Sequence, residues 1–167
     1  MATSTGIELA QSIRLKIEDL KKVCAGVDEN MASRAPVERW SPKEILSHLL
    51  GPEGTGRLAI FQAFLTAETP TITMHTANPF FSEKRAKMTF AQILSEVERE
   101  YEDIARFAEG LSPEQLDRKA HIPALKESPL GEYPTLGAFL AGVGGYHVQF
   151  HVDHMREILQ ALGAPAK

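Results

Sequence analysis

Apolar residues recur at intervals of three and four along much of the chain, which is the pattern of amphipathic helices. The first stretch predicts a helix over residues 4–27, with its apolar stripe at Ile13, Ile17, Leu20, Cys24 and Val27. Another stretch predicts a helix from Thr89 to Phe107 or Ala108, with its apolar stripe at Phe90, Ile93, Val97, Tyr101 and Ile104. Thr89 and Gln92 have the spacing of a capping box, which marks the start of this helix.

A further helix is predicted between these two. It starts at Ser41, because Ser41 and Glu44 have capping-box spacing and proline, here Pro42, is favoured at the first helical position. Its apolar face consists of Ile45, Leu46, Leu49 and Leu50. The following pair Gly51-Pro52 is expected to break or kink the helix, because proline interrupts helical hydrogen bonding. The helical pattern then resumes as far as about Glu68.

The last helix is predicted from Thr135 to about Leu162. Three glycines inside it lower its intrinsic stability. These glycines are Gly142, Gly144 and Gly145. They indicate either a close approach by another helix or space left for a ligand.

Two stretches show no sustained period and are predicted to be long loops, residues 69–88 and residues 119–134. The first loop carries His75 and the pair Phe80-Phe81, which are expected to cover the core and to contribute to the rim of a pocket. The chain is therefore expected to be an all-α protein, a four-helix bundle with long loops between helices 2 and 3 and between helices 3 and 4. Its length fits a single domain over residues 1–167.

Composition and charge narrow the class of protein. The 167 residues carry a formal net charge of -4 and no basic patch, so a nucleic-acid partner is not expected. No apolar run is long enough to span a membrane. The single cysteine, Cys24, lies in an apolar stripe and is expected in the core, and the absence of a cysteine pair is typical of a reducing compartment. We therefore expect a cytoplasmic protein.

Three histidines of the last helix, His147, His151 and His154, project from one face at helical spacing. An unbroken helix places them on the same apolar stripe as Leu136 and Leu140. A buried imidazole needs a partner for each ring nitrogen, and a divalent metal bound by neutral nitrogens provides one. The alternative is a set of core histidines satisfied by ordinary hydrogen bonds. The zinc-protease pattern His-Glu-x-x-His is absent from this stretch.

Two stretches of the chain resemble the DinB-like family, small helical bundles named after a damage-inducible protein. The first is Trp40-Ser41-Pro42-Lys43-Glu44-Ile45-Leu46-Ser47-His48-Leu49, which is similar to the family pattern Trp-Ser/Thr-x-x-Glu-x-x-x-His-Leu at the start of the second helix. The second is Gly131 and Thr135-Leu136-Gly137 followed by His147-x-x-x-His151, which is similar to the family's last helix. The order of elements matches over essentially the whole chain, and the specific residues are confined to these two segments.

The resemblance implies a three-histidine site for a divalent metal, with His48, His147 and His151 as ligands. By the helix pattern alone, His48 lies at the edge of the apolar face and is predicted to be a partly exposed surface residue. The family commonly carries an acidic residue a few positions after the first histidine, and Glu53 matches that place. In this chain Gly51-Pro52 stands between His48 and Glu53, so the sequence does not determine where the Glu53 side chain points. His154 stands where the family often has glutamine. Four roles remain open for it: a fourth metal ligand, a residue that hydrogen-bonds to a ligand, a proton carrier or a packed residue.

Three neutral nitrogens leave a divalent ion with open positions for water, and zinc, nickel, iron and manganese all accept imidazole. Such an ion lowers the pKa of bound water or of a thiol, and Glu53 or His154 would then move protons. DinB-like proteins include thiol-dependent transferases and proteins described as metal-dependent hydrolases. The resemblance therefore implies a hydrolase, or a transferase of a low-molecular-weight thiol, that acts on a small-molecule substrate.

Two other functions remain open at this stage. One is a non-catalytic, stress-related bundle that binds a metal or a small ligand and forms a homodimer, because exposed apolar stripes favour two-fold association. The other is a helical bundle that binds no metal and whose core histidines are hydrogen-bonded.

Overall fold

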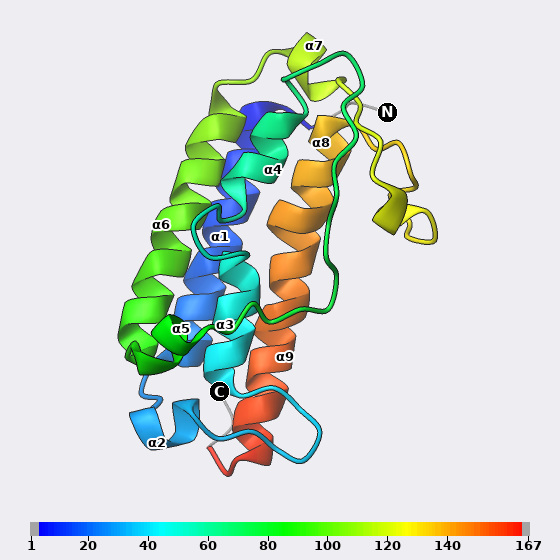
Figure 1. The fold of residues 1–167 in the computed structure, drawn as a ribbon. Coiled ribbons are helices and arrows are strands. Elements are labelled where there is room, and N and C mark those ends of the chain that lie inside the picture. The colour runs from blue at the N-terminus through cyan, green and yellow to red at the C-terminus, as the bar shows by residue number, and fades with distance from the viewer. Residues whose placement is uncertain (1–3, 165–167) are drawn as a thin grey trace.

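Long helices lie side by side in the computed structural model, which describes residues 4–164 (Figure 1). The bundle consists of α1 (Gly6–Cys24), α3 (Pro42–Leu50) continued by α4 (Leu58–Ala63), α6 (Phe90–Glu109), and a last arm formed by α8 (Leu136–Phe139), η2 (Leu140–Tyr146) and α9 (His147–Ala161). The described part of the chain contains no strand, so the expected all-α four-helix bundle is confirmed. Within the same residues, no helix has the length and apolar character needed to cross a bilayer.

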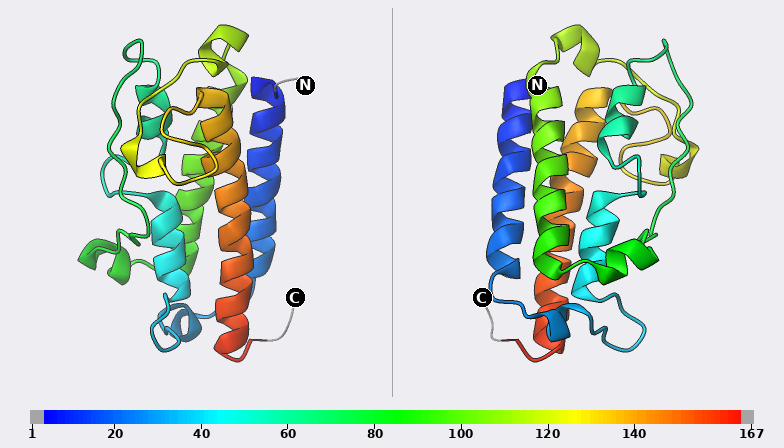
Figure 2. Two further views of the ribbon diagram at one scale, coloured as in Figure 1. Left: turned by 90° about the vertical axis from the view of Figure 1, so that its right-hand side faces the viewer. Right: turned by 60° about the vertical axis from the view of Figure 1, so that its left-hand side comes forward.

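The two long loops are present and are joined to each other, but the first begins earlier than predicted, because α4 ends at Ala63 and not near Glu68. Ile72 donates its backbone N–H to the His121 carbonyl at 2.8 Å, and His121 donates to the Pro70 carbonyl at 2.8 Å. Both loops run on the same side of the bundle (Figure 2). They contain short elements that are too brief to show a helical period and that the sequence pattern does not predict, α5 (Glu83–Lys87) and η1 (Pro123–Leu125). The same holds for α2 (Glu29–Ala32), whereas α7 (Pro113–Leu116) follows a capping box at Ser112.

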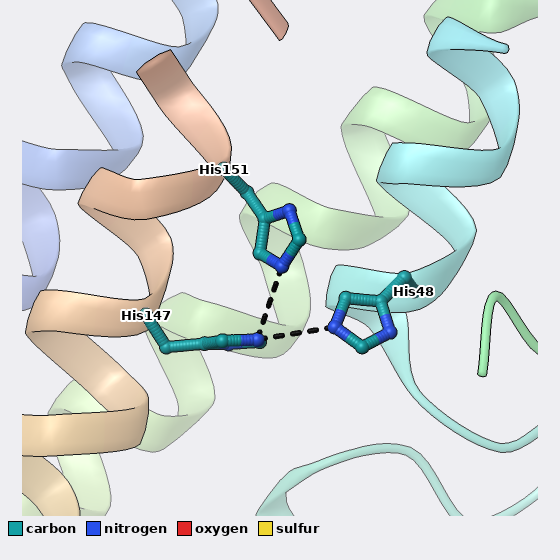
Figure 3. A group of neighbouring side chains, drawn as sticks. All are labelled: His48, His147 and His151. Carbon is teal, nitrogen blue, oxygen red and sulfur yellow. Dashed lines mark hydrogen bonds between the residues drawn. The ribbon is translucent and has the colours of Figure 1, made fainter. Parts of the chain in front are cut away.

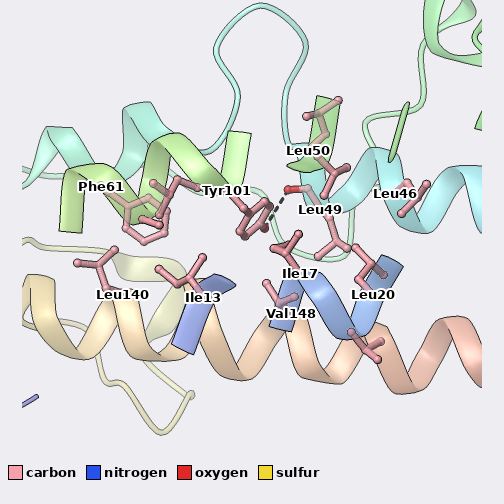
Figure 4. Close-up of a cluster of buried hydrophobic side chains, with 14 of the residues drawn as sticks. Ile13, Ile17, Leu20, Leu46, Leu49, Leu50, Phe61, Tyr101, Leu140 and Val148 are labelled. Carbon is pink, nitrogen blue, oxygen red and sulfur yellow. Dashed lines mark hydrogen bonds between the residues drawn. The ribbon is translucent and has the colours of Figure 1, made fainter. Parts of the chain in front are cut away.

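The core lies between the four arms (Figure 4). α1 packs against α6 and against the last arm, and α3 packs against α6 and α9. Gly144 faces α1 so closely that an added Cβ would lie 3.1 Å from the Cδ1 of Ile13. The close helix approach suggested by the glycines is therefore confirmed at this point. The largest fully buried side chains are Tyr101, Phe61, Phe64, Phe139, Ile13, Leu20, Ile45, Leu46, Leu49, Ile93, Ile104 and Ile122.

Helix α3 ends inside the molecule, and its last carbonyl groups are bound by side chains from other elements. Gly51 adopts a positive φ of 83° and turns the chain away. Arg57 donates to the carbonyls of His48 and Leu49, and Arg85 donates to those of Ser47 and Gly51. The Leu49 carbonyl also accepts the Tyr101 hydroxyl at 3.0 Å. Helix ends leave unpaired carbonyls that need partners, and here two buried guanidinium groups supply most of them.

The last arm changes its winding in the middle, because η2 is a seven-residue π-helix that contains all three glycines. A π turn holds one residue more than an α turn, so such a segment rotates the following residues by on the order of 100° relative to an unbroken α-helix. The core stripe accordingly continues from Leu136, Phe139 and Leu140 to Val148, Val152, Met155 and Leu159. The prediction that the histidines share the stripe of Leu136 and Leu140 is wrong for this reason.

Replacing Arg85 by methionine tests the role of the guanidinium groups at the end of α3. The Arg85→Met variant leaves the Gly51 carbonyl without its donor in a buried place and removes one of the two donors to the Ser47 carbonyl. We expect the free energy of unfolding to fall by on the order of 3 kcal/mol, as measured by urea denaturation. The neighbouring exposed residue provides the control, because Lys84→Met should change stability by less than about 0.5 kcal/mol. Equal stability of the two variants would contradict the assignment.

Candidate metal centre

His48, His147 and His151 come together at the place where α3 meets α9 (Figure 3). One ligand atom from each of the three side chains lies within 4.8 Å of the other two. The Nε2 atom of His147 is 3.0 Å from that of His48 and 3.1 Å from that of His151. A tetrahedral zinc ion with bonds of about 2.0–2.1 Å would hold such nitrogens about 3.3–3.4 Å apart. The two separations that involve His147 are thus within about 0.4 Å of those in a coordinating arrangement.

Hydrogen bonds at the outer nitrogens set the tautomers of two of these rings. His48 Nδ1 lies 2.6 Å from the Asn78 carbonyl oxygen, so this nitrogen carries the proton and Nε2 keeps its lone pair. His151 Nδ1 lies 3.2 Å from His154 Nδ1, and when it donates there its Nε2 lone pair is also free. Hydrogen bonds of this kind at the nitrogen that does not bind metal are typical of metal-ligating histidines.

The remaining ring, His147, cannot be satisfied by protons alone. Its Nδ1 is buried and has no hydrogen-bond partner among the described residues. Its Nε2 faces two lone pairs, those of His48 and His151, and a single N–H would have to serve both contacts. A cation that accepts all three lone pairs relieves this conflict. The donor set therefore fits a divalent metal.

Burial keeps all three imidazoles in the neutral form that a metal requires. Loss of hydration lowers the pKa of His48 to about 4, although its bond to the Asn78 carbonyl opposes this shift. The same cause, followed by repulsion between the imidazoles, lowers the pKa of His147 to about 3 and that of His151 to about 2. Desolvation also lowers the pKa of His154.

The prediction from the helix pattern that His48 is partly exposed is wrong, since only 5% of the residue is accessible. The first long loop covers it. Asn78 binds its ring through the backbone, and Phe80 stacks on it with the ring centroids 6.4 Å apart. Trp40 closes the other side, with its ring centroid 5.1 Å from that of His48. The expected covering role of this loop is thus observed at Phe80.

The three histidines lie at the wall of a cavity of about 900 Å³. His154 lines the same cavity, half-buried beside His151, and His75 lies at its exposed edge. The lining comes from the segment before α3, the two long loops and the last arm. The volume is within the range of about 300–1,000 Å³ that is usual for sites that bind small molecules.

Glu53 is not brought to the histidines. It is exposed and lines a different, smaller hollow of about 250 Å³ together with Arg85 and Glu100. Its charge raises the pKa of Arg85, against the larger lowering caused by burial of that guanidinium. The positive φ of Gly51 turns the chain in this direction. Arg57, which sequence reasoning did not single out, lines the histidine cavity instead. The signal in the sequence that was available but not used is the position of this arginine shortly after a broken helix, whose free carbonyl groups need donors.

A scan against protein-family models finds no match, and a search of curated proteins finds none either. Among solved structures the chain is similar to YfiT from Bacillus subtilis, described as "a probable metal-dependent hydrolase with an unusual four-helix bundle topology". The TM-score is 0.79 at 17% sequence identity, and the match covers 99% of this chain and 91% of that one. At this identity, what the likeness establishes for the present chain is the fold, a four-helix bundle shared with YfiT.

Proposed function

We propose that the protein is a metal-dependent hydrolase of the DinB-like type that acts on a small molecule, with His48, His147 and His151 as the metal ligands. The observation that carries the proposal is the gathering of three imidazole nitrogens, one from each histidine and all within 4.8 Å of one another, at the wall of a large cavity. The description of YfiT as "a probable metal-dependent hydrolase" supports it, since the two chains share their fold. When bound, a divalent cation lowers the pKa of water and polarises a carbonyl or phosphoryl group.

The chain's own residues have separate tasks in this proposal. The Asn78 carbonyl orients the His48 ring, and His154 orients His151 through its Nδ1 atom. His154 also faces the cavity, so its half-buried imidazole is in a position to accept and return a proton there. Trp40 contacts the rings of both His48 and His151 and shields them from solvent. We assign no catalytic task to Glu53, because it lies in the other hollow.

Metal content tests the ligand assignment. We expect about one divalent ion per chain in protein purified without chelator, as measured by elemental analysis. The variants His48→Ala and His151→Ala should lose it, because each removes one of three donors. His154→Ala should retain the ion but bind it roughly 10- to 100-fold more weakly, since it removes only the partner behind His151.

His121→Ala is the matched control for these variants, since its ring pairs with Glu132 and lies outside the cavity lining. It should keep full occupancy. Full occupancy in His48→Ala would refute the ligand set. The same proteins serve for activity: hydrolysis of a panel of nitrophenyl esters should disappear after chelation, return with added metal, and be lost in His48→Ala. Turnover that requires a low-molecular-weight thiol would identify a transferase instead.

Stability of the metal-free protein should fall as the pH is lowered. The three ligand histidines have folded-state pKa values of about 4, 3 and 2, below the usual unfolded value of about 6.5. Between these limits the unfolded chain binds more protons, so stability is full above about pH 6.5 and is lost as the pH falls toward 4. Each histidine contributes at most about 1.4 kcal/mol per pH unit.

Urea denaturation at several pH values between 7.5 and 5 measures this slope. The variant His151→Asn should show a slope that is shallower by up to about 1.4 kcal/mol per pH unit, because it removes one of the protons taken up on unfolding. Gln160→Asn, which alters an exposed residue of the same helix that carries no titratable group, should keep the slope of the original protein. Identical slopes in all three proteins would show that the cluster is not held neutral.

A further inference from the structure

The wall of the histidine cavity is largely apolar. It is lined by Trp40, Met74, Leu130, Val143, Tyr146 and Phe150. Tyr146 and Phe150 lie one helical turn apart and are 77% and 56% accessible, although large aromatic side chains usually avoid such exposure. Aromatic surface of this kind next to a cavity is suited to an apolar molecule larger than water.

Arg57 carries a positive charge at this cavity and makes no ion pair within residues 4–164, although the Glu100 carboxylate accepts its backbone N–H. Arg57 lines the cavity and is only 4% accessible. Its Nε and Nη2 atoms donate to the carbonyls at the end of α3, while among residues 4–164 no carboxylate lies within ion-pair distance and no hydrogen bond of Nη1 is found. Arg14 and Arg39, by contrast, pair with carboxylates. Buried charges are rare without a partner of opposite sign.

The metal ligands do not offset the positive charge of Arg57. Three neutral imidazoles supply no negative charge, so a divalent cation held by them keeps both of its positive charges. Arg57 binds the backbone of His48, one of these ligands, and its charge is therefore close to theirs. The carboxylate among the lining residues, Glu38, is exposed to solvent. The inner end of the cavity is thus cationic and its outer walls are apolar.

From this arrangement we propose that the cavity binds an organic anion, a molecule with an apolar body and one carboxylate, sulfonate or phosphate group. The anionic group lies at Arg57, beside the metal ligands, and the body packs along the aromatic wall. Arg57 is then a residue that determines specificity in addition to closing the end of α3. The proposal deepens the proposed hydrolase function by naming its substrate class, but binding itself depends on the cavity and can be measured without metal.

Two fluorescent probes with the same ring system test it. Anilinonaphthalene sulfonate carries the anionic group, and phenylnaphthylamine lacks it. With metal-free protein, Arg57→Gln should weaken binding of the sulfonate by about tenfold or more and leave that of phenylnaphthylamine within about twofold, because only the sulfonate makes a charged hydrogen bond with this residue. Arg39→Gln is the matched control, since Arg39 also lines the cavity but pairs with Glu157, and it should change neither affinity by more than about twofold.

Equal losses for both probes in Arg57→Gln would overturn the proposal, since a purely structural arginine would produce them. Near-ultraviolet circular dichroism establishes that the variant is folded. If it is not, the original protein decides by displacement of phenylnaphthylamine, where octanoate should compete at least about tenfold better than octylammonium. An equal or better effect of octylammonium would also overturn it.

Repeating the titrations after loading with zinc separates this proposal from the proposed function. If the protein binds no metal, the hydrolase proposal fails. The anion proposal is then still decided by the titrations of the metal-free protein. A preference for the sulfonate that appears only with zinc, and that is unchanged in Arg57→Gln, would place the anion at the metal and remove the role given to Arg57.

Discussion

The central constraint in this molecule is that helix α3 ends in the interior. A helix that stops there exposes carbonyl groups that no water can reach, and these must be bound by donors from elsewhere. Arg57, Arg85 and Tyr101 converge on this end from three different elements. Because His48 belongs to the last turn of α3, the same bonds hold its imidazole opposite α9. The break also diverts the chain into the long loop that covers the site. The stability of the bundle and the geometry of its histidines therefore have a common origin.

Burial then determines the chemistry of the histidines. Removal from water keeps their rings neutral, and neutrality leaves lone pairs that face one another and that a cation satisfies. Within residues 4–164 no carboxylate forms an ion pair with the Arg57 guanidinium, so this charge remains able to attract an anion. A cavity with an apolar wall and a cationic end is complementary to a molecule that has an apolar body and one anionic group.

The sequence was sufficient for features that depend on local residues. Capping boxes at Ser41 and Thr89, the break at Gly51 and the spacing of His147 and His151 all predicted what is observed. Features that depend on distant contacts were beyond it. Burial of His48 comes from a loop about thirty residues away, as its bond to Asn78 shows. Short helices such as α5 have no measurable period. Glu53 matched a family position, but a backbone turn directs it elsewhere.

The π-helical segment carries a consequence for how such sites are inherited. The angle at which His147 and His151 enter the cavity depends on the number of residues between Thr135 and His147. Loss of one residue from the glycine-rich stretch would let the arm wind as an ordinary α-helix and would swing both rings away from His48. Two chains with identical histidines but a spacer that differs by one residue would thus differ in whether the trio can assemble at all. Chain length at this point is as much a part of the site as the imidazoles.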